Sequence, residues 1–112
     1  MELHRDNNGV ITSHISTENP GHEYGIELTY DDGGGDFIEI HFQKGPVKTN
    51  GVNGITSEAL LAILIHRTEV LNSNFPCAEN EAAIAGLKTA LEAFESRTRD
   101  RIARQVEGEN KV

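Results

Sequence analysis

Hydrophobic positions recur with two different periods along this chain. Over residues 22–46, apolar side chains alternate with polar ones, and an Asp- and Gly-rich stretch at residues 31–36 divides the run in two. Alternation on both sides of a turn-forming stretch predicts a β-hairpin with one buried face. The residues expected on the apolar face are Tyr24, Ile26, Leu28 and Tyr30 in the first strand and Ile38, Ile40 and Phe42 in the second. Pro46 ends the second strand because proline cannot continue a ladder.

Residues 1–21 carry no clear pattern. Val10, Ile11 and Ile15 are enough for one short edge strand, and the sequences Asn-Asn-Gly and Asn-Pro-Gly on either side of it are turn signals. We therefore expect the first several residues to be loose.

From Thr56 onward, the apolar spacing changes to that of helices. Thr56 is a good N-cap, and Glu58 falls in the first turn, where a carboxylate opposes the positive end of the helix dipole. The pattern predicts a first helix from Ser57 to Leu71, a break at residues 72–76 and a second helix from Ala78 to Arg104, within a helical hairpin at 56–108. The second helix carries a heptad-like seam of Ile84, Leu87, Leu91, Phe94 and Thr98.

The two helices differ in expected length. An antiparallel pairing leaves roughly 12 residues, or about 18 Å, of the second helix beyond the start of the first. That overhang is expected near the glycine-rich connection at residues 49–54 and near the amino end of the first helix, which favours anions.

Composition narrows the class of protein. With 112 residues, we expect one domain at 1–112 with an α+β fold, and association with other copies would help so small a core. The net charge of -8 argues against DNA or RNA binding, and a single cysteine excludes an internal disulfide. The longest apolar window is too short to cross a bilayer, and no signal peptide is visible, so we expect a soluble, unexported protein.

Basic residues are nevertheless concentrated near the end of the second helix. Arg97, Arg101 and Arg104 fall within about 60° of one another on a helical wheel, whereas Arg99 points elsewhere. Arginine binds phosphate oxygens in pairs and also stacks on purines, so this stripe suggests a compact phosphate-bearing ligand. The alternative is an ordinary solvated helix end whose arginines pair with Asp100 or other nearby acids.

Two stretches carry a family resemblance. Residues 40–67, IHFQKGPVKTNGVNGITSEALLAILIHR, and residues 77–108, CAENEAAIAGLKTALEAFESRTRDRIARQVEG, resemble the small phage proteins that sequester immune signalling nucleotides. These are the Thoeris anti-defence sponges and their relatives that counter CBASS immunity. The likeness covers about residues 38–112, and the strand-bearing N-terminal half favours the Thoeris type.

The resemblance implies a protein that is not an enzyme and needs no cofactor. It implies a homo-oligomer, a dimer assembled into a hexamer, in the cytoplasm of the host bacterium. The expected ligands are glycocyclic ADP-ribose isomers, with CBASS cyclic di- and trinucleotides at separate sites. Binding deprives the host effector of its trigger.

Individual positions follow from the same likeness. Asn80 matches a polar ligand contact early in the second helix, and Arg97 and Arg101 match an arginine pair near its end. An aromatic contact of the family falls at Leu71, so either the base is held less firmly here or Phe75 covers it. The predicted ligand-binding residues are Asn80, Arg97, Thr98, Arg101, Leu71 and Phe75. For Asn80 and Phe75, the alternatives are local backbone bonding and core packing.

Other chemistry has weaker support. The five histidines form no HxH or HxxxH pair, so neither a metal site nor a catalytic site is predicted. Cys77 is interpreted as a buried, small apolar residue. Two alternative functions stay open: a hydrolase of the same signals, and a helical protein-interaction module.

Overall fold

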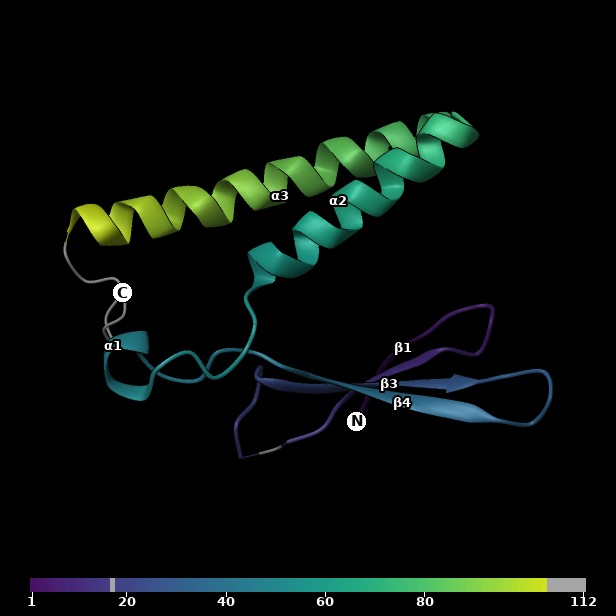
Figure 1. Ribbon diagram of the computed structural model, residues 1–112, viewed down its shortest axis with the longest axis horizontal. Coiled ribbons are helices and arrows are strands. Elements are labelled where there is room, and N and C mark those ends of the chain that lie inside the picture. Colours follow the sequence, from purple (N-terminus) through teal and green to yellow (C-terminus); the bar gives the residue numbers. More distant parts are fainter. Residues whose placement is uncertain (17, 105–112) are drawn as a thin grey trace. The chain divides into compact units, whose positions relative to one another are not determined.

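The computed structural model describes residues 1–16 and 18–104, and the chain divides into two compact units (Figure 1). One unit comprises residues 1–44 and 52–55, and the other comprises residues 45–51 and the chain from Thr56 onward. We call them the sheet unit and the helical unit. The predicted α+β fold is confirmed, whereas the single domain stays a prediction.

The sheet unit is a four-stranded antiparallel meander in the order β1-β2-β3-β4 (Figure 1). Its strands are β1 (Glu2–Arg5), β2 (Ile11–His14), β3 (Glu23–Thr29) and β4 (Gly35–His41). The predicted hairpin corresponds to β3 and β4. Its register places Tyr24 opposite Ile40 and Ile26 opposite Ile38, so the apolar side chains share one face as expected. The predicted burial of this face is wrong for the described chain, because its side chains are half-buried or exposed and Ile38 and Tyr30 are each 47% exposed.

The prediction of loose N-terminal residues is wrong. β1 pairs with β2, and the backbones of Met1 and His14 exchange two hydrogen bonds of 2.8 and 3.0 Å. The Asp6 carboxylate closes the intervening turn by accepting from the N–H groups of Asn8 and Val10 at 2.8 and 3.0 Å. The Asn-Asn-Gly turn signal was therefore correct, but the turn joins two strands. Backbone pairing orders β1 although its side chains are exposed, which hydrophobic patterning does not detect.

The helical unit contains α1 (Val47–Asn50), α2 (Ser57–Asn74) and α3 (Ala78–Ala103). Thr56 caps α2 as predicted, because its hydroxyl accepts from the Ala59 N–H at 3.1 Å. The part of the predicted hairpin at residues 105–108 lies outside the described residues.

α2 continues three residues beyond the predicted end at Leu71. The Asn72 side chain accepts from the Cys77 N–H at 3.0 Å, and the Phe75 N–H donates to the Leu71 carbonyl at 2.9 Å, so the break comes only at Pro76. With 26 residues in α3 and 18 in α2, the difference is eight residues, or about 12 Å. The overhang visible in Figure 1 is therefore shorter than the predicted 12 residues.

Packing between α2 and α3 buries little. Ile65 on α2 is the buried hydrophobic residue of the described chain, with 8% of its surface exposed, and Lys88 pairs with Glu69 across the helices at 3.2 Å.

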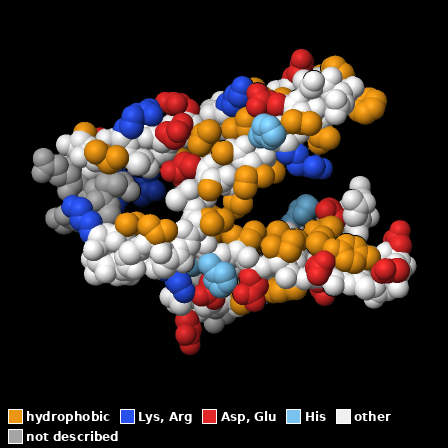
Figure 2. All heavy atoms as spheres, viewed as in Figure 1, with side chains coloured by type: hydrophobic (Ala, Val, Ile, Leu, Met, Phe, Trp, Pro, Cys, Tyr) orange, Lys and Arg blue, Asp and Glu red, His pale blue; other side chains and the backbone are white. Residues whose placement is uncertain are grey.

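A second apolar face of α2 stays open, and Figure 2 shows hydrophobic side chains along this helical unit. That face comprises Ile63, Leu64, Val70 and Leu71, which are 42–62% exposed. None of the described helices is long and apolar enough to cross a membrane.

Candidate functional site

Most half-buried side chains on α3 follow a heptad spacing, and Ala90, beside Leu91, is the half-buried position outside it. With Phe94, which is 39% exposed, the row advances in alternating steps of four and three along the helix. The positions are Asn80, Ile84, Leu87, Leu91, Phe94, Thr98 and Arg101. The predicted apolar seam is therefore extended at both ends by polar residues of the predicted ligand set. We call this row the α3 seam.

Asn80 lies at the start of this seam, in the first turn of α3. Its backbone N–H donates to the sulfur of Cys77 at 3.4 Å, so Cys77 acts as the N-cap. Within the described chain, the Asn80 side-chain amide makes no hydrogen bond. Local backbone bonding therefore does not explain this side chain, and its donor and acceptor are open to a ligand.

The tip of the helical hairpin is apolar and exposed. Phe75 is 81% exposed and Leu71 is 42% exposed, so the core-packing alternative for Phe75 is not what the chain shows. Cys77 is exposed as well, and its predicted burial is wrong because it caps α3 from the interhelical loop. An apolar surface of this kind can cover a nucleobase.

The arginines at the other end of α3 divide into two groups. Arg99 pairs with Glu92 at 2.8 Å, and Arg104 pairs with Asp100 at 2.9 Å, as the alternative of a solvated helix end requires. Arg97 is exposed and makes no ion pair or hydrogen bond within residues 1–16 and 18–104. Arg101 is half-buried on the seam. Arg97 thus differs from its neighbours in having an uncommitted guanidinium group.

One rigid helix separates the two groups of predicted ligand residues. Asn80 and Arg97 are 17 residues apart on α3, which is about 26 Å at 1.5 Å per residue. A dinucleotide-sized ring is much shorter than this. The structure therefore brings Thr98 and Arg101 close to Arg97, and Asn80 close to the tip with Phe75, but it does not bring the two groups together within one chain.

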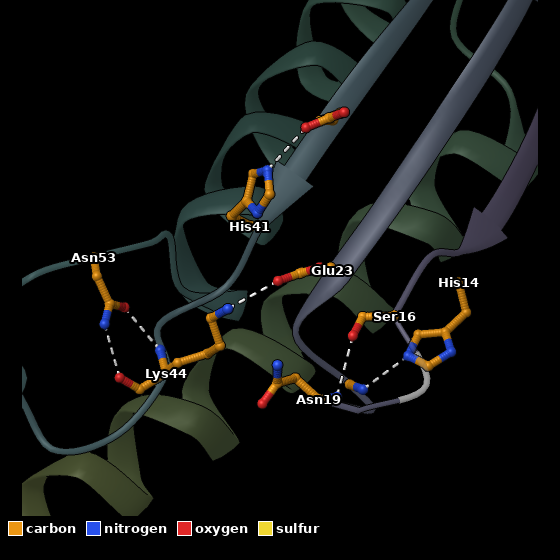
Figure 3. Close-up of polar contacts among 9 residues, drawn as sticks. His14, Ser16, Asn19, Glu23, His41, Lys44 and Asn53 are labelled. Carbon is orange, nitrogen blue, oxygen red and sulfur yellow. Dashed lines mark hydrogen bonds and ion pairs between the residues drawn. The ribbon is translucent and has the colours of Figure 1, made fainter.

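A polar junction at one end of the sheet was missed by sequence reasoning. The Asn53 side chain accepts from the Lys44 N–H and donates to the Lys44 carbonyl, both at 2.8 Å (Figure 3). The Asn53 N–H donates to the Gln43 side chain at 2.9 Å. The Lys44 ammonium donates to Glu23 at 2.8 Å, and this bond holds the pKa of the Glu23 carboxyl below its ordinary value of 4.5. The repeated Asn-Gly at residues 50–51 and 53–54 was the available signal.

Histidines near the junction do not form a metal site. The His14 Nε2 accepts from the Gly21 N–H at 3.1 Å, and His41 contacts Glu39 at 3.1 Å (Figure 3). The buried Nδ1 of His22 has no hydrogen-bond partner in the described structure. Among residues 1–16 and 18–104, no three His, Cys, Asp or Glu side chains are grouped so as to hold a metal ion.

Comparison with known proteins identifies the class of this fold. Residues 35–99 match the family described as Acb2/Tad1, hairpin domain, and this match spans more than half of the chain. The chain belongs to that family. It is also 41% identical over 83 residues to a protein named Thoeris anti-defense 1 from Bacillus phage SBSphiJ7. The aligned segment covers 73% of this chain and 58% of that relative, so the chain spans less than two thirds of the relative's length.

Proposed function

We propose that this chain is a phage anti-defence protein that binds cyclic nucleotide immune signals in the host cytoplasm and holds them without breaking a bond. The main support is that the Asn80 and Arg97 side chains on α3 make no hydrogen bond or ion pair within the described chain. The family match and a relative named Thoeris anti-defense 1 support the same proposal. The expected ligands are glycocyclic ADP-ribose isomers, with CBASS cyclic di- and trinucleotides as further candidates.

The pocket in this proposal is shared between two copies of the chain. Because Asn80 and Arg97 are about 26 Å apart on one helix, a single small ligand contacts both only if they come from different subunits. An antiparallel pairing of two α3 helices about a point between Lys88 and Thr89 places Asn80 of each copy opposite Arg97 of the other. This two-fold arrangement gives two equivalent pockets per dimer.

The open apolar face of α2 supports such a dimer. Four neighbouring side chains at Ile63, Leu64, Val70 and Leu71 are 42–62% exposed, and contacts with another copy would remove them from water. Further association of dimers into a hexamer remains part of the proposal.

Each predicted residue has a physical role in the pocket. Arg97 and Arg101 neutralise phosphate oxygens, and Thr98 lies between them in sequence with a hydroxyl that can donate to the ligand. Asn80 binds a polar edge of the base or ribose, and Leu71 or Phe75 covers the base. Exclusion of water between subunits strengthens each charged contact.

Isothermal titration calorimetry tests this proposal. Wild-type protein is titrated with glycocyclic ADP-ribose isomers and, separately, with a panel of cyclic di- and trinucleotides. Saturable binding of at least one compound is expected. No heat of binding across the panel would contradict the proposal and favour a helical protein-interaction module.

Since a sponge does not consume its ligand, the protein must accumulate to concentrations comparable with the signal.

A further inference from the structure

Asparagine is followed directly by glycine at three places in the chain: Asn8-Gly9, Asn50-Gly51 and Asn53-Gly54. In this dipeptide the asparagine side chain reacts readily with the next backbone nitrogen, because glycine has no Cβ to obstruct the approach. All three asparagines are exposed, so access to water does not distinguish them. The hydrogen bonds and the space around each dipeptide therefore decide which of them reacts.

The reaction is deamidation, which makes asparagine one of the thermolabile residues. The glycine nitrogen loses its proton and bonds to the side-chain Cγ of the asparagine, and the side-chain nitrogen leaves as ammonia with that proton. Water then adds to one of the two carbonyl carbons of the resulting succinimide ring, and the bond from that carbon to the glycine nitrogen breaks. The product is aspartate when Cγ is attacked and isoaspartate when the backbone carbonyl is attacked. The first step requires a side chain that can rotate, a glycine N–H released from its hydrogen bond, and room for the ring.

The Asn8-Gly9 dipeptide meets these requirements in the turn between β1 and β2. Within the described chain, the Asn8 side-chain amide makes no hydrogen bond. The Gly9 N–H makes one, to the Asp6 carbonyl at 3.1 Å. A Cβ atom placed at Gly9 would meet nothing within 4 Å, so the turn has room for a ring. One hydrogen bond has to open before the reaction can begin.

The Asn53-Gly54 dipeptide is held at each group that the reaction uses. The Asn53 side chain accepts from the Lys44 N–H and donates to the Lys44 carbonyl, both at 2.8 Å (Figure 3). The Asn53 N–H donates to the Gln43 side chain at 2.9 Å. A Cβ atom placed at Gly54 would collide with the carbonyl carbon of Phe42, so there is no room for a ring without a shift of the backbone. Three hydrogen bonds and close packing oppose the reaction.

We infer that Asn8 is a site of spontaneous deamidation in the folded protein, whereas the fold protects Asn53 from the same reaction. At Asn50, the last residue of α1, the N–H groups of Asn50 and Gly51 donate to the Pro46 and Val47 carbonyls at 2.8 and 2.9 Å, so reaction there requires α1 to unwind.

Deamidation changes the turn in which it occurs. The Asp6 carboxylate binds the N–H groups of Asn8 and Val10, and the product places a second carboxylate close to it. Isoaspartate also lengthens the backbone of the turn by one carbon. Ageing therefore disturbs the pairing of β1 with β2 first, and this effect does not depend on ligand binding.

Peptide mass spectrometry of aged protein tests the inference. The full chain is incubated in mildly alkaline buffer, once folded and once in guanidinium chloride, and conversion at Asn8 and Asn53 is followed with time. Each rate in the folded protein is divided by the rate of the same site in denaturant. Folding should slow Asn8 by only about fivefold, the cost of one hydrogen bond, but Asn53 by about a hundredfold, the cost of three. Equal slowing of the two sites, or reaction of Asn8 in denaturant only, would overturn the inference.

A matched pair of variants assigns the protection to named bonds. Asp6→Ala removes the acceptor that orders the turn, so it should speed Asn8 and leave Asn53 unchanged. Gln43→Ala removes one of the three bonds of Asn53, so it should speed Asn53 by about fivefold and leave Asn8 unchanged. Acceleration of both sites by either variant would mean that global unfolding sets the rates, and this would overturn the inference. Acceleration of neither site would also overturn it, because these bonds would then not be the protection.

Discussion

Asn80 and Thr98 lie on the same side of α3, five helical turns and about 27 Å apart, and both are half-buried. The residues between them on the α3 seam are apolar. The α3 seam thus has polar residues at both of its ends. A small ligand cannot contact both ends of the seam within one chain.

Mixing two inactive variants tests the shared pocket. As separate proteins, Asn80→Ala and Arg97→Ala should each bind the ligand about tenfold to a hundredfold more weakly, too weakly for detection at the concentration that saturates wild type. When the two are co-expressed with different tags and purified through both, each heterodimer has one intact pocket, because both substitutions fall in the other pocket. Calorimetry should then recover binding at about half the wild-type stoichiometry. Either variant carrying both tags by itself is the control, and a mixed protein that stays inactive would contradict a pocket formed between subunits.

Single arginine variants test which arginines near the end of α3 bind the ligand. Arg97→Ala and Arg101→Ala should each weaken ligand binding by about tenfold to a hundredfold, the cost of a lost charge-assisted hydrogen bond. Arg99→Ala is the matched control because Arg99 is paired with Glu92 at 2.8 Å on the same helix. Its affinity should stay within about twofold of wild type, as expected where only an exposed ion pair is lost. Equal losses in all three variants would mean that binding follows net charge rather than this site.

The Glu23 and Lys44 pair predicts a pH effect in the sheet unit. Since Lys44 lowers the pKa of the Glu23 carboxyl in the folded protein, the pair stabilises the fold above the unfolded pKa of Glu23. This contribution is lost as pH falls through the lower, folded pKa. Carboxyl carbon NMR should show the Glu23 pKa returning toward 4.5 in Lys44→Met. An unchanged Glu23 pKa in that variant would show that Lys44 is not its cause.

Alanine substitutions at Gly54 and Gly86 should have opposite effects on the free energy of unfolding. A Cβ atom at Gly54 would lie 2.4 Å from the Phe42 carbonyl carbon and 2.6 Å from the Gln43 nitrogen, so Gly54→Ala must displace backbone at the junction. A Cβ at Gly86 on α3 meets nothing within 4 Å. Urea unfolding should therefore show Gly54→Ala destabilised by more than about 1 kcal/mol and Gly86→Ala stabilised by about 0.5–1 kcal/mol. Equal effects of the two substitutions would refute the close approach at Gly54.

Sequence periodicity predicted the parts of the fold that gather apolar side chains on one face. It located β3, β4 and both long helices, and Thr56 and Ala78 were placed correctly because capping and helix restart follow local rules. It did not find β1, whose order comes from backbone pairing with β2. It ended α2 too early because the bond from Cys77 to the Asn72 side chain is not visible in composition.

The candidate site was predictable only in part. Helical spacing set Arg97 apart from Arg99, and the structure agrees that Arg99 is committed elsewhere, to Glu92. The repeated Asn-Gly marks a turn at Asn53, but it does not reveal the partners of Asn53, which lie nine and ten positions away in sequence. Nor could spacing alone show that the Asn80 side chain is left without a local partner.

Recovery of the ligand tests the central claim most directly. A cyclic ADP-ribose-type signal that binds in calorimetry is incubated with excess protein at working temperature, the protein is then denatured by heat, and the released compound is identified by chromatography and mass spectrometry. A heated sample without protein gives the reference. The free signal should disappear on mixing and return in full, chemically intact, after denaturation. Recovery of cleavage products in place of the signal would contradict capture without reaction and identify the protein as an enzyme.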